Sequence, residues 1–136
     1  MDDPSPPPPA QLLAALWDDD RATALSLVAA GVDPNAADSR DIGQAWTPLH
    51  FAAGVGDQEL VRALVAAGAD VDARSVAGQT PLWWACNNGH LAAARELLSA
   101  GADPNARSTE GYSPLGRVLG SDAALMELVR SYGGVV

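Results

Sequence analysis

A fixed period of 33 residues runs through this sequence and limits what the chain can fold into. The tripeptide Thr47-Pro48-Leu49 recurs 33 residues later, from position 80, and again from position 113 with Ser in place of Thr. A second marker is Ala-Gly with an Asp two positions after the Gly, and its glycines are Gly31, Gly68 and Gly101. The last two of these glycines are also 33 residues apart. Two independent markers with one period predict a stack of repeated units.

Each unit carries the start and stop signals of two helices. The hydroxyl before each Pro can accept a hydrogen bond from a backbone N–H, and Pro tolerates the first helical position because its missing donor is not needed there. Helices are therefore predicted to begin at Pro48, Pro81 and Pro114. Gly56 and Gly89 follow too soon for a long helix, and a second apolar face comes after each of them. Each unit is predicted to be helix, turn, helix and extended arm.

These units resemble the ankyrin repeat. The unit over 47–79 matches that pattern nearly throughout, in Thr47-Pro48-Leu49-His50, Ala52-Ala53, Gly56 and Gly68-Ala69-Asp70. The unit over 80–112 matches except that Trp83 replaces the His. The resemblance implies an all-α solenoid of helix-turn-helix units joined by hairpin-like arms, with Leu64 and Leu97 buried between units.

The resemblance also divides the chain. Units are expected at about 11–46, 47–79, 80–112 and 113–136, and the first and last look like caps. They form one predicted domain over 10–136, preceded by a disordered tail over 1–9 in which five residues are Pro.

The first connection is longer than the others. Gly31 and Gly68 are 37 residues apart, so four extra residues lie within 36–46. Because an arm tip already has a minimal turn, we expect the insertion to lengthen the tip and to present Ile42 to a partner.

Composition excludes several classes of function. The chain has 17 acidic and 8 basic residues, a net charge of −9, and its basic residues are all Arg. Such a surface repels nucleic acid, and no apolar run approaches the length of a membrane span. Cys86 is the single cysteine, so a reducing, cytoplasmic setting is expected. The absence of Lys, together with the Ala-rich composition, favours a GC-rich genome and a bacterial source.

The sequence gives little support for a catalytic site or a metal-binding site. In ankyrin repeats the residue equivalent to His50 bonds between neighbouring units, and Gly89-His90 is an ordinary turn dipeptide. Both histidines are thus explained by the repeat, which leaves no general base for a nucleophile. Cys86 and His90 are four residues apart, but Gly89 interrupts the helix between them. The consecutive aspartates over 18–20 are typical of a solvated turn. We predict no catalytic residue, no metal site and no cofactor.

The functional hint lies in the positions that the repeat leaves variable. In ankyrin proteins these are the arm tip, the residue before Thr, the residue after the His position and the two residues before the Gly turn. Four of the seven aromatic residues occupy the before-Thr and after-His positions, although core stability does not require aromatics there. The predicted partner-binding residues are Trp17, Asp18, Ile42, Trp46, Phe51, Gln79, Trp84, Asn87, Tyr112 and Arg117.

The function predicted is a noncatalytic, monomeric protein-binding module. Its partner is a protein or peptide with exposed basic and apolar residues, because the aromatic positions are surrounded by negative charge. Trp84 is expected to touch the partner, whereas Trp83 is expected to fill the space between units. Open alternatives are an inhibitor or immunity-type protein that masks a basic toxin or enzyme, and, from another class, a metal-binding or hydrolytic enzyme. A scaffold with no partner is a further alternative, against which the aromatic positions argue.

Overall fold

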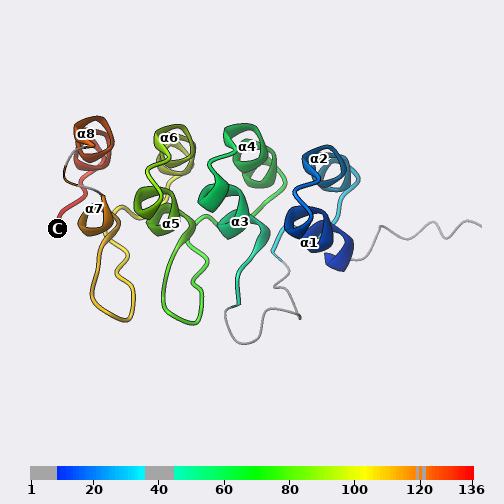
Figure 1. Ribbon diagram of the computed structural model, residues 1–136, viewed down its shortest axis with the longest axis horizontal. Coiled ribbons are helices and arrows are strands. Elements are labelled where there is room, and N and C mark those ends of the chain that lie inside the picture. Colours follow the sequence, from blue (N-terminus) through cyan, green and yellow to red (C-terminus); the bar gives the residue numbers. More distant parts are fainter. Residues whose placement is uncertain (1–8, 36–44, 119, 121) are drawn as a thin grey trace, which may run out of the picture.

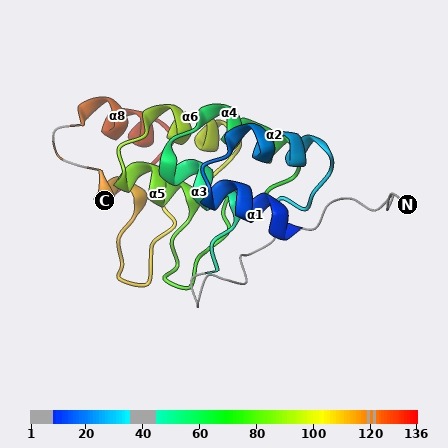
Figure 2. The same ribbon diagram turned by 45° about the vertical axis from the view of Figure 1, so that its right-hand side comes forward.

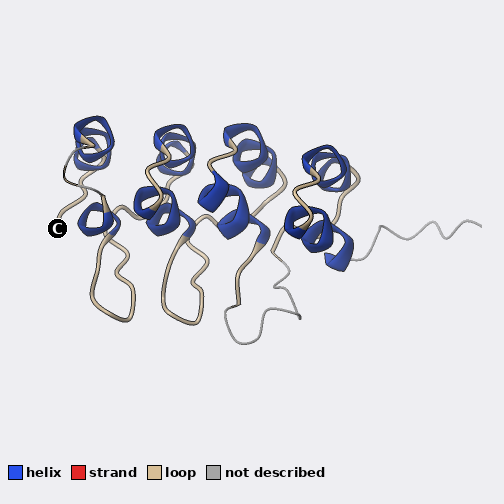
Figure 3. Ribbon diagram, viewed as in Figure 1, coloured by secondary structure: helices blue, strands red, loops and turns tan. Residues whose placement is uncertain are grey.

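The computed structural model describes residues 9–35, 45–118, 120 and 122–136. Over these residues the chain is all-helical, as expected, with no strand in the arms (Figure 3). The helices are α1 (Pro9–Trp17), α2 (Arg21–Ala29), α3 (Pro48–Val55), α4 (Gln58–Ala66), α5 (Pro81–Asn87), α6 (Leu91–Ser99), α7 (Pro114–Arg117) and α8 (Ala123–Ser131).

The helices form a two-layered row of four antiparallel pairs (Figure 1). The first helices of the pairs, α1, α3, α5 and α7, make one layer, and the second helices, α2, α4, α6 and α8, make the other. The described arms project from the first-helix layer, away from the second helices (Figure 2). We call the surface formed by the first helices and the arms the first-helix face. Each pair packs on the next one, which is the predicted solenoid.

The first helices of the last three units begin where the sequence places them, at Pro48, Pro81 and Pro114. The hydroxyl of Thr80 accepts from the backbone N–H of Trp83 at 3.2 Å. Ser113 does the same for Gly116 at the same distance, so both residues cap their helices as predicted.

Glycines end the helices. Gly56 lies directly after α3 with a φ of 79°, and Gly68 lies just beyond α4 with a φ of 99°. Both values belong to the left-handed region that glycine enters without a steric penalty. The predicted breaks between helices are therefore confirmed.

The core lies between the layers and between successive units. Leu64 and Leu97 are fully buried there, as predicted. His50 ties α3 to the start of the next unit, because its Nε2 lies 2.9 Å from the carbonyl oxygen of Gln79, the residue before Thr80, and its Nδ1 accepts from the backbone N–H of Thr47 at 3.0 Å. These two bonds assign the proton to Nε2 and confirm the structural role expected for this histidine.

Three details refine the sequence analysis. Helix α1 begins at Pro9, one residue before the domain boundary that we expected, since Pro suits the first helical position. Helix α7 has four residues and ends at Arg117, because the backbone of the next residue, Val118, is extended with a ψ of 131°. The four-residue insertion and Ile42 fall within 36–44, outside the described residues.

Candidate protein-binding surface

Aromatic rings from three successive units touch in an unbroken series on the first-helix face. Trp17 at the end of α1 meets Phe51 of α3 with ring centroids 4.9 Å apart. Phe51 meets Trp46 at 5.6 Å, and Trp46 meets Trp84 of α5 at 5.3 Å. Trp84 meets Trp83 at 5.2 Å. Every contact is edge-to-face, the geometry that aromatic quadrupoles favour. We call these five residues the aromatic strip.

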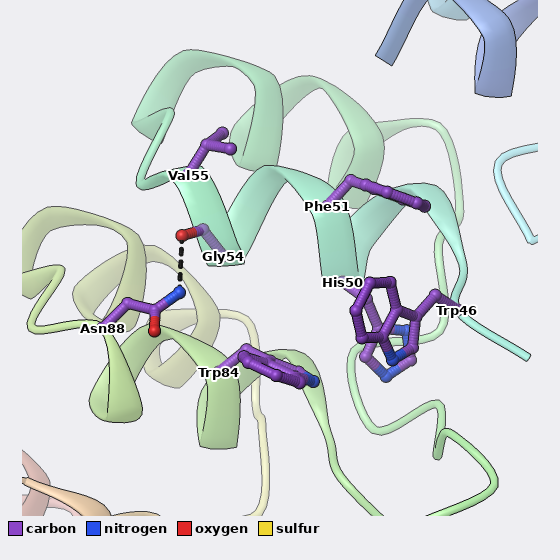
Figure 4. Close-up of a pocket in the computed structure, with 7 residues that line it drawn as sticks. All are labelled: Trp46, His50, Phe51, Gly54, Val55, Trp84 and Asn88. Atoms are coloured by element: carbon purple, nitrogen blue, oxygen red, sulfur yellow. Dashed lines mark hydrogen bonds between the residues drawn. The ribbon is translucent and has the colours of Figure 1, made fainter. Parts of the chain in front are cut away.

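A groove of about 190 Å³ opens between α3 and α5 in the middle of the strip (Figure 4). It is lined by Trp46, His50, Phe51, Gly54, Val55, Trp84 and Asn88. Gly54 contributes no side chain, and Val55 at the edge is 67% exposed. The groove is therefore mostly apolar, open to the surface and wide enough for a side chain of a partner.

The groove is held by hydrogen bonds between the two helix pairs. The carbonyl oxygen of Gly54 accepts from Asn88 Nδ2 at 2.8 Å, which Figure 4 shows, and lies 3.0 Å from His90 Nε2. Both residues belong to the next unit, so one exposed carbonyl fixes the spacing of α3 and α5. The groove is built into the stack and does not require a partner to form.

The two adjacent tryptophans of α5 differ in burial. Trp83 is 6% exposed and fills the space between units, which confirms the role expected for it. Trp84 is half-buried and presents part of its ring to the groove. The indole N–H of each is buried, and neither has a hydrogen-bond partner among the described residues.

At the carboxy-terminal end of the strip, Arg117 is fixed by its neighbours. Asn87 Oδ1 accepts from Arg117 Nε at 3.1 Å and from Nη2 at 2.8 Å. The guanidinium lies 5.2 Å from the ring centroid of Trp83 and 5.1 Å from that of Tyr112. Three predicted site residues, Asn87, Tyr112 and Arg117, thus lie together, each in contact with another of them or with the strip.

The remaining predicted residues surround this surface. Trp17 is 49% exposed and Asp18, which follows it, is exposed. Gln79 is half-buried at the base of an arm, where its side-chain oxygen accepts from the hydroxyl of Ser75 at 3.3 Å. The structure therefore joins the described members of the predicted set from α1 to α7.

The repeated helix pairs match a known protein family. A family model described as "Ankyrin repeats (3 copies)" matches residues 12–108. The chain belongs to the ankyrin repeat family. The match ends before the fourth unit, yet α7 and α8 continue the ankyrin stack by packing on α5 and α6. No curated protein matches the chain. Ankyrin repeats are protein-interaction modules and are typically noncatalytic. Membership of this family is therefore consistent with a protein-binding role for the first-helix face.

Four groove residues, His50, Gly54, Val55 and Asn88, were absent from the predicted set. His50 was expected to be structural. The other three occupy the variable positions just before the Gly turn, so the repeat pattern itself was the signal that could have found them. The bond from Asn88 to Gly54 had no such signal, because it depends on how two ankyrin units are spaced.

Cys86, which was considered as a nucleophile or a metal ligand, lies in the core of the ankyrin stack. Cys86 is completely buried, and burial, assisted by the charge of Asp122, raises the pKa of its thiol from 9.0 to about 12. A thiol with that pKa is protonated at neutral pH and is a poor nucleophile or ligand. Within the described ranges, no group of three or more His, Cys, Asp or Glu side chains is placed to hold a metal ion. Nor is any described helix long and apolar enough to cross a bilayer.

Proposed function

We propose that this ankyrin protein binds a protein partner through its first-helix face, with the aromatic strip as the central contact. The observation that carries the proposal is the continuity of the strip across three units, with the open groove in its middle. Tryptophan and tyrosine dominate the energetics of protein interfaces, where a single anchor contributes about 2 kcal/mol or more. Four of the five rings in the strip are partly exposed on a rigid stack, as such anchors are.

The charge of the chain supports a partner with basic and apolar groups. The net charge is −9, and Asp18 and Glu110 are exposed close to the two ends of the strip. Opposite charge raises the rate of encounter, and a cation of the partner gains further from lying over an indole face. The partner-free protein is proposed to be a monomer in a reducing compartment such as the cytoplasm, where the free thiol of Cys86 is stable.

A second candidate is a more specific form of the same activity. An acidic module with a preformed face can act as an inhibitor or immunity-type protein that covers a basic toxin or enzyme. The excess of 17 acidic over 8 basic residues favours this candidate. The two candidates differ in outcome, because an inhibitor abolishes the activity of its partner and an adaptor leaves that activity intact.

The proposal is tested by placing a charge in the groove. Val55→Asp introduces a carboxylate at the exposed edge of the apolar lining, where a docked partner would have to desolvate it. Ala92→Asp is the matched control, since it adds the same charge to an exposed site near the start of α6 in the second-helix layer. Proteins retained from a lysate of the source organism by the unaltered chain are identified by mass spectrometry and then purified.

The purified partner decides the result. We expect Val55→Asp to weaken its affinity at least tenfold, about 1.4 kcal/mol, and Ala92→Asp to change it less than twofold. Equal losses in both variants, or a loss in Ala92→Asp alone, would move the binding surface to the second helices. Assays of the partner's own activity then separate the inhibitor from the adaptor.

A further inference from the structure

Arg117 is a positioned cation that pairs with no carboxylate among the described residues. Among the described arginines, Arg21 forms ion pairs with Asp57 and Glu59, whereas Arg117 forms none. Its Nε and Nη2 are held by Asn87, and Nη1 donates to no described residue. The guanidinium is half-buried and packed against two rings, so little side-chain entropy remains to be lost on binding.

The opposite end of the aromatic strip carries excess negative charge, because the nearby Arg21 is already paired with Asp57 and Glu59. Asp18 and Asp19 follow α1, both are exposed, and neither carboxylate has a hydrogen bond or ion pair within the described part of the chain. Asp19 lines a hollow of about 40 Å³ that shares Phe51 and Val55 with the apolar groove. The hollow at the acidic end therefore adjoins the groove, with Phe51 and Val55 common to the two linings.

Resting on the proposed function, we propose that the first-helix face recognises a partner segment by the order of its charges. The segment places a basic side chain beside Asp18 and Asp19, a large apolar side chain in the groove between α3 and α5, and a carboxylate on Arg117. Each element meets its complement: cation with aspartates, apolar group with aromatic rings, and carboxylate with a fixed guanidinium. The order also fixes the direction in which the partner lies along the stack.

The spacing of the helices sets a minimum length for this segment. The path from α1 to α7 crosses three contacts between neighbouring first helices, α1 with α3, α3 with α5 and α5 with α7. At about 8 to 10 Å for each packed pair, the path is about 24 to 30 Å. A fully extended chain covers about 3.3 Å per residue, so the segment needs about eight residues or more.

Glu110 provides a second test of the contact proposed at Arg117. It is exposed and lines the same hollow of about 200 Å³ as Arg117, yet no ion pair joins the two side chains. Its charge opposes an incoming carboxylate. Neutralising Glu110 should therefore strengthen a contact between Arg117 and an acidic partner group, which is the opposite of the effect of neutralising Arg117.

Synthetic peptides of about ten residues are the probes. One carries arginines at one end, leucine and phenylalanine in the middle, and glutamates at the other end. A second replaces the glutamates by glutamines, and a third replaces the arginines by glutamines. Affinities are measured by calorimetry for the unaltered chain and for variants whose melting temperatures are unchanged.

Each variant should affect one end of the peptide. We expect the Asp18→Asn, Asp19→Asn double variant to weaken both arginine-containing peptides about threefold to fivefold and to leave the third unchanged. Asparagine suits position 19, where φ is 55°. Arg117→Gln should weaken only the glutamate-containing peptides, by a similar factor, and Arg117→Lys should restore part of the loss. Glu110→Gln should strengthen the same peptides about twofold.

The outcomes separate this inference from the proposed function. If Val55→Asp abolishes peptide binding but the charge variants have no effect, the binding face stands and the charge order is wrong. If Arg117→Gln weakens all three peptides equally, Arg117 acts through the packing of Trp83 and Tyr112, and the inference fails. Absence of binding by every peptide at about 1 mM, only about 4 kcal/mol of affinity, also overturns it, while the intact partner still tests the face.

Discussion

Asp72 accepts a hydrogen bond from the backbone N–H of Asp103 at 2.8 Å. This bond joins the segment that follows α4 to the segment that follows α6. Asn35 stands at the equivalent position one unit earlier and makes two such bonds. Its Oδ1 accepts from the N–H of Asp70 at 2.7 Å, and its Nδ2 donates to the carbonyl oxygen of Gly68 at 3.2 Å. The carboxylate of Asp72 has no N–H to donate, so it makes only one of these two bonds.

Restoring the second bond should stabilise the protein. In Asp72→Asn the new amide would donate to the carbonyl oxygen of Gly101, which accepts no hydrogen bond from any described residue. Asn105, one unit later, already makes both bonds, to Val135 and Gly133 at 2.8 and 3.0 Å. We expect a gain of about 0.5 to 1.5 kcal/mol in the free energy of unfolding, measured by denaturant titration.

A control separates the hydrogen bond from the loss of charge. Glu127→Gln removes one negative charge from an exposed side chain of α8 that makes no described hydrogen bond. Both variants reduce the net charge of −9 by one, so relief of general repulsion is the same in each. Equal gains in stability would show that the amide at position 72 forms no new bond.

Gly56 is a second position where one substitution tests the geometry. An added Cβ would lie 2.5 Å from Nδ1 of His90, whose other ring nitrogen bonds to Gly54. The φ of 79° is also unfavourable for any residue with a Cβ. Gly56→Ala should therefore both strain the backbone and displace His90 from its hydrogen bond with Gly54.

Gly68→Ala supplies the control for this prediction. Gly68 has a φ of 99°, but no atom lies within 4 Å of an added Cβ, so only the backbone strain applies. We expect Gly68→Ala to cost about 1 to 2 kcal/mol and Gly56→Ala at least about 1 kcal/mol more. Thermal unfolding compares the two, and similar losses would mean that His90 moves aside without cost.

Much of the fold follows from the sequence because the repeat uses local signals. Pro48 and Gly56 mark a helix by their backbone chemistry alone, and His50 keeps the contact that its motif implies. Trp83 was harder to place, since replacement of a polar residue by an indole does not reveal which neighbour it covers. The structure shows that it lies under Arg117, a contact between two units.

The binding surface could be predicted only as a set of positions. Trp46 and Trp84 were assigned to it because the repeat leaves their positions variable, but their mutual contact depends on the spacing of α3 and α5. Asn87 shows the same limit. Its sequence position suggested contact with a partner, whereas in the structure it accepts two hydrogen bonds from Arg117. Periodicity places residues on a face and does not pair them.

Cys86 should make stability depend on alkaline pH. Burial raises the pKa of its thiol to about 12 in the folded protein, while the unfolded chain has the ordinary value of 9.0. Between these values the unfolded state binds fewer protons than the folded state, so the free energy of unfolding falls as pH rises. The slope contributed by this group is at most about 1.4 kcal/mol per pH unit.

The variant Cys86→Ala isolates this contribution. The other ionisable groups are present in both proteins, so their contributions cancel in the difference. Denaturant titrations between pH 8 and 11 should show the unaltered chain losing stability faster than Cys86→Ala. Parallel curves would mean that the thiolate is accommodated in the fold, and that Cys86 is less enclosed than its complete burial indicates.

Trp17 and Tyr132 offer a matched test of the aromatic strip. Trp17 is 49% exposed and touches Phe51, whereas Tyr132 is 46% exposed and follows α8, where its hydroxyl lies 3.4 Å from that of Ser99. Both rings are about half exposed to water, so truncating either one should cost the fold a similar, modest amount of stability.

Binding should distinguish them, because Trp17 extends the strip and Tyr132 lies outside it. We expect Trp17→Ala to weaken a partner at least tenfold, about 1.4 kcal/mol, and Tyr132→Ala to leave its affinity within about twofold. Calorimetry against the purified partner measures both variants, and an equal loss from Tyr132→Ala would place part of the interface on the second helices.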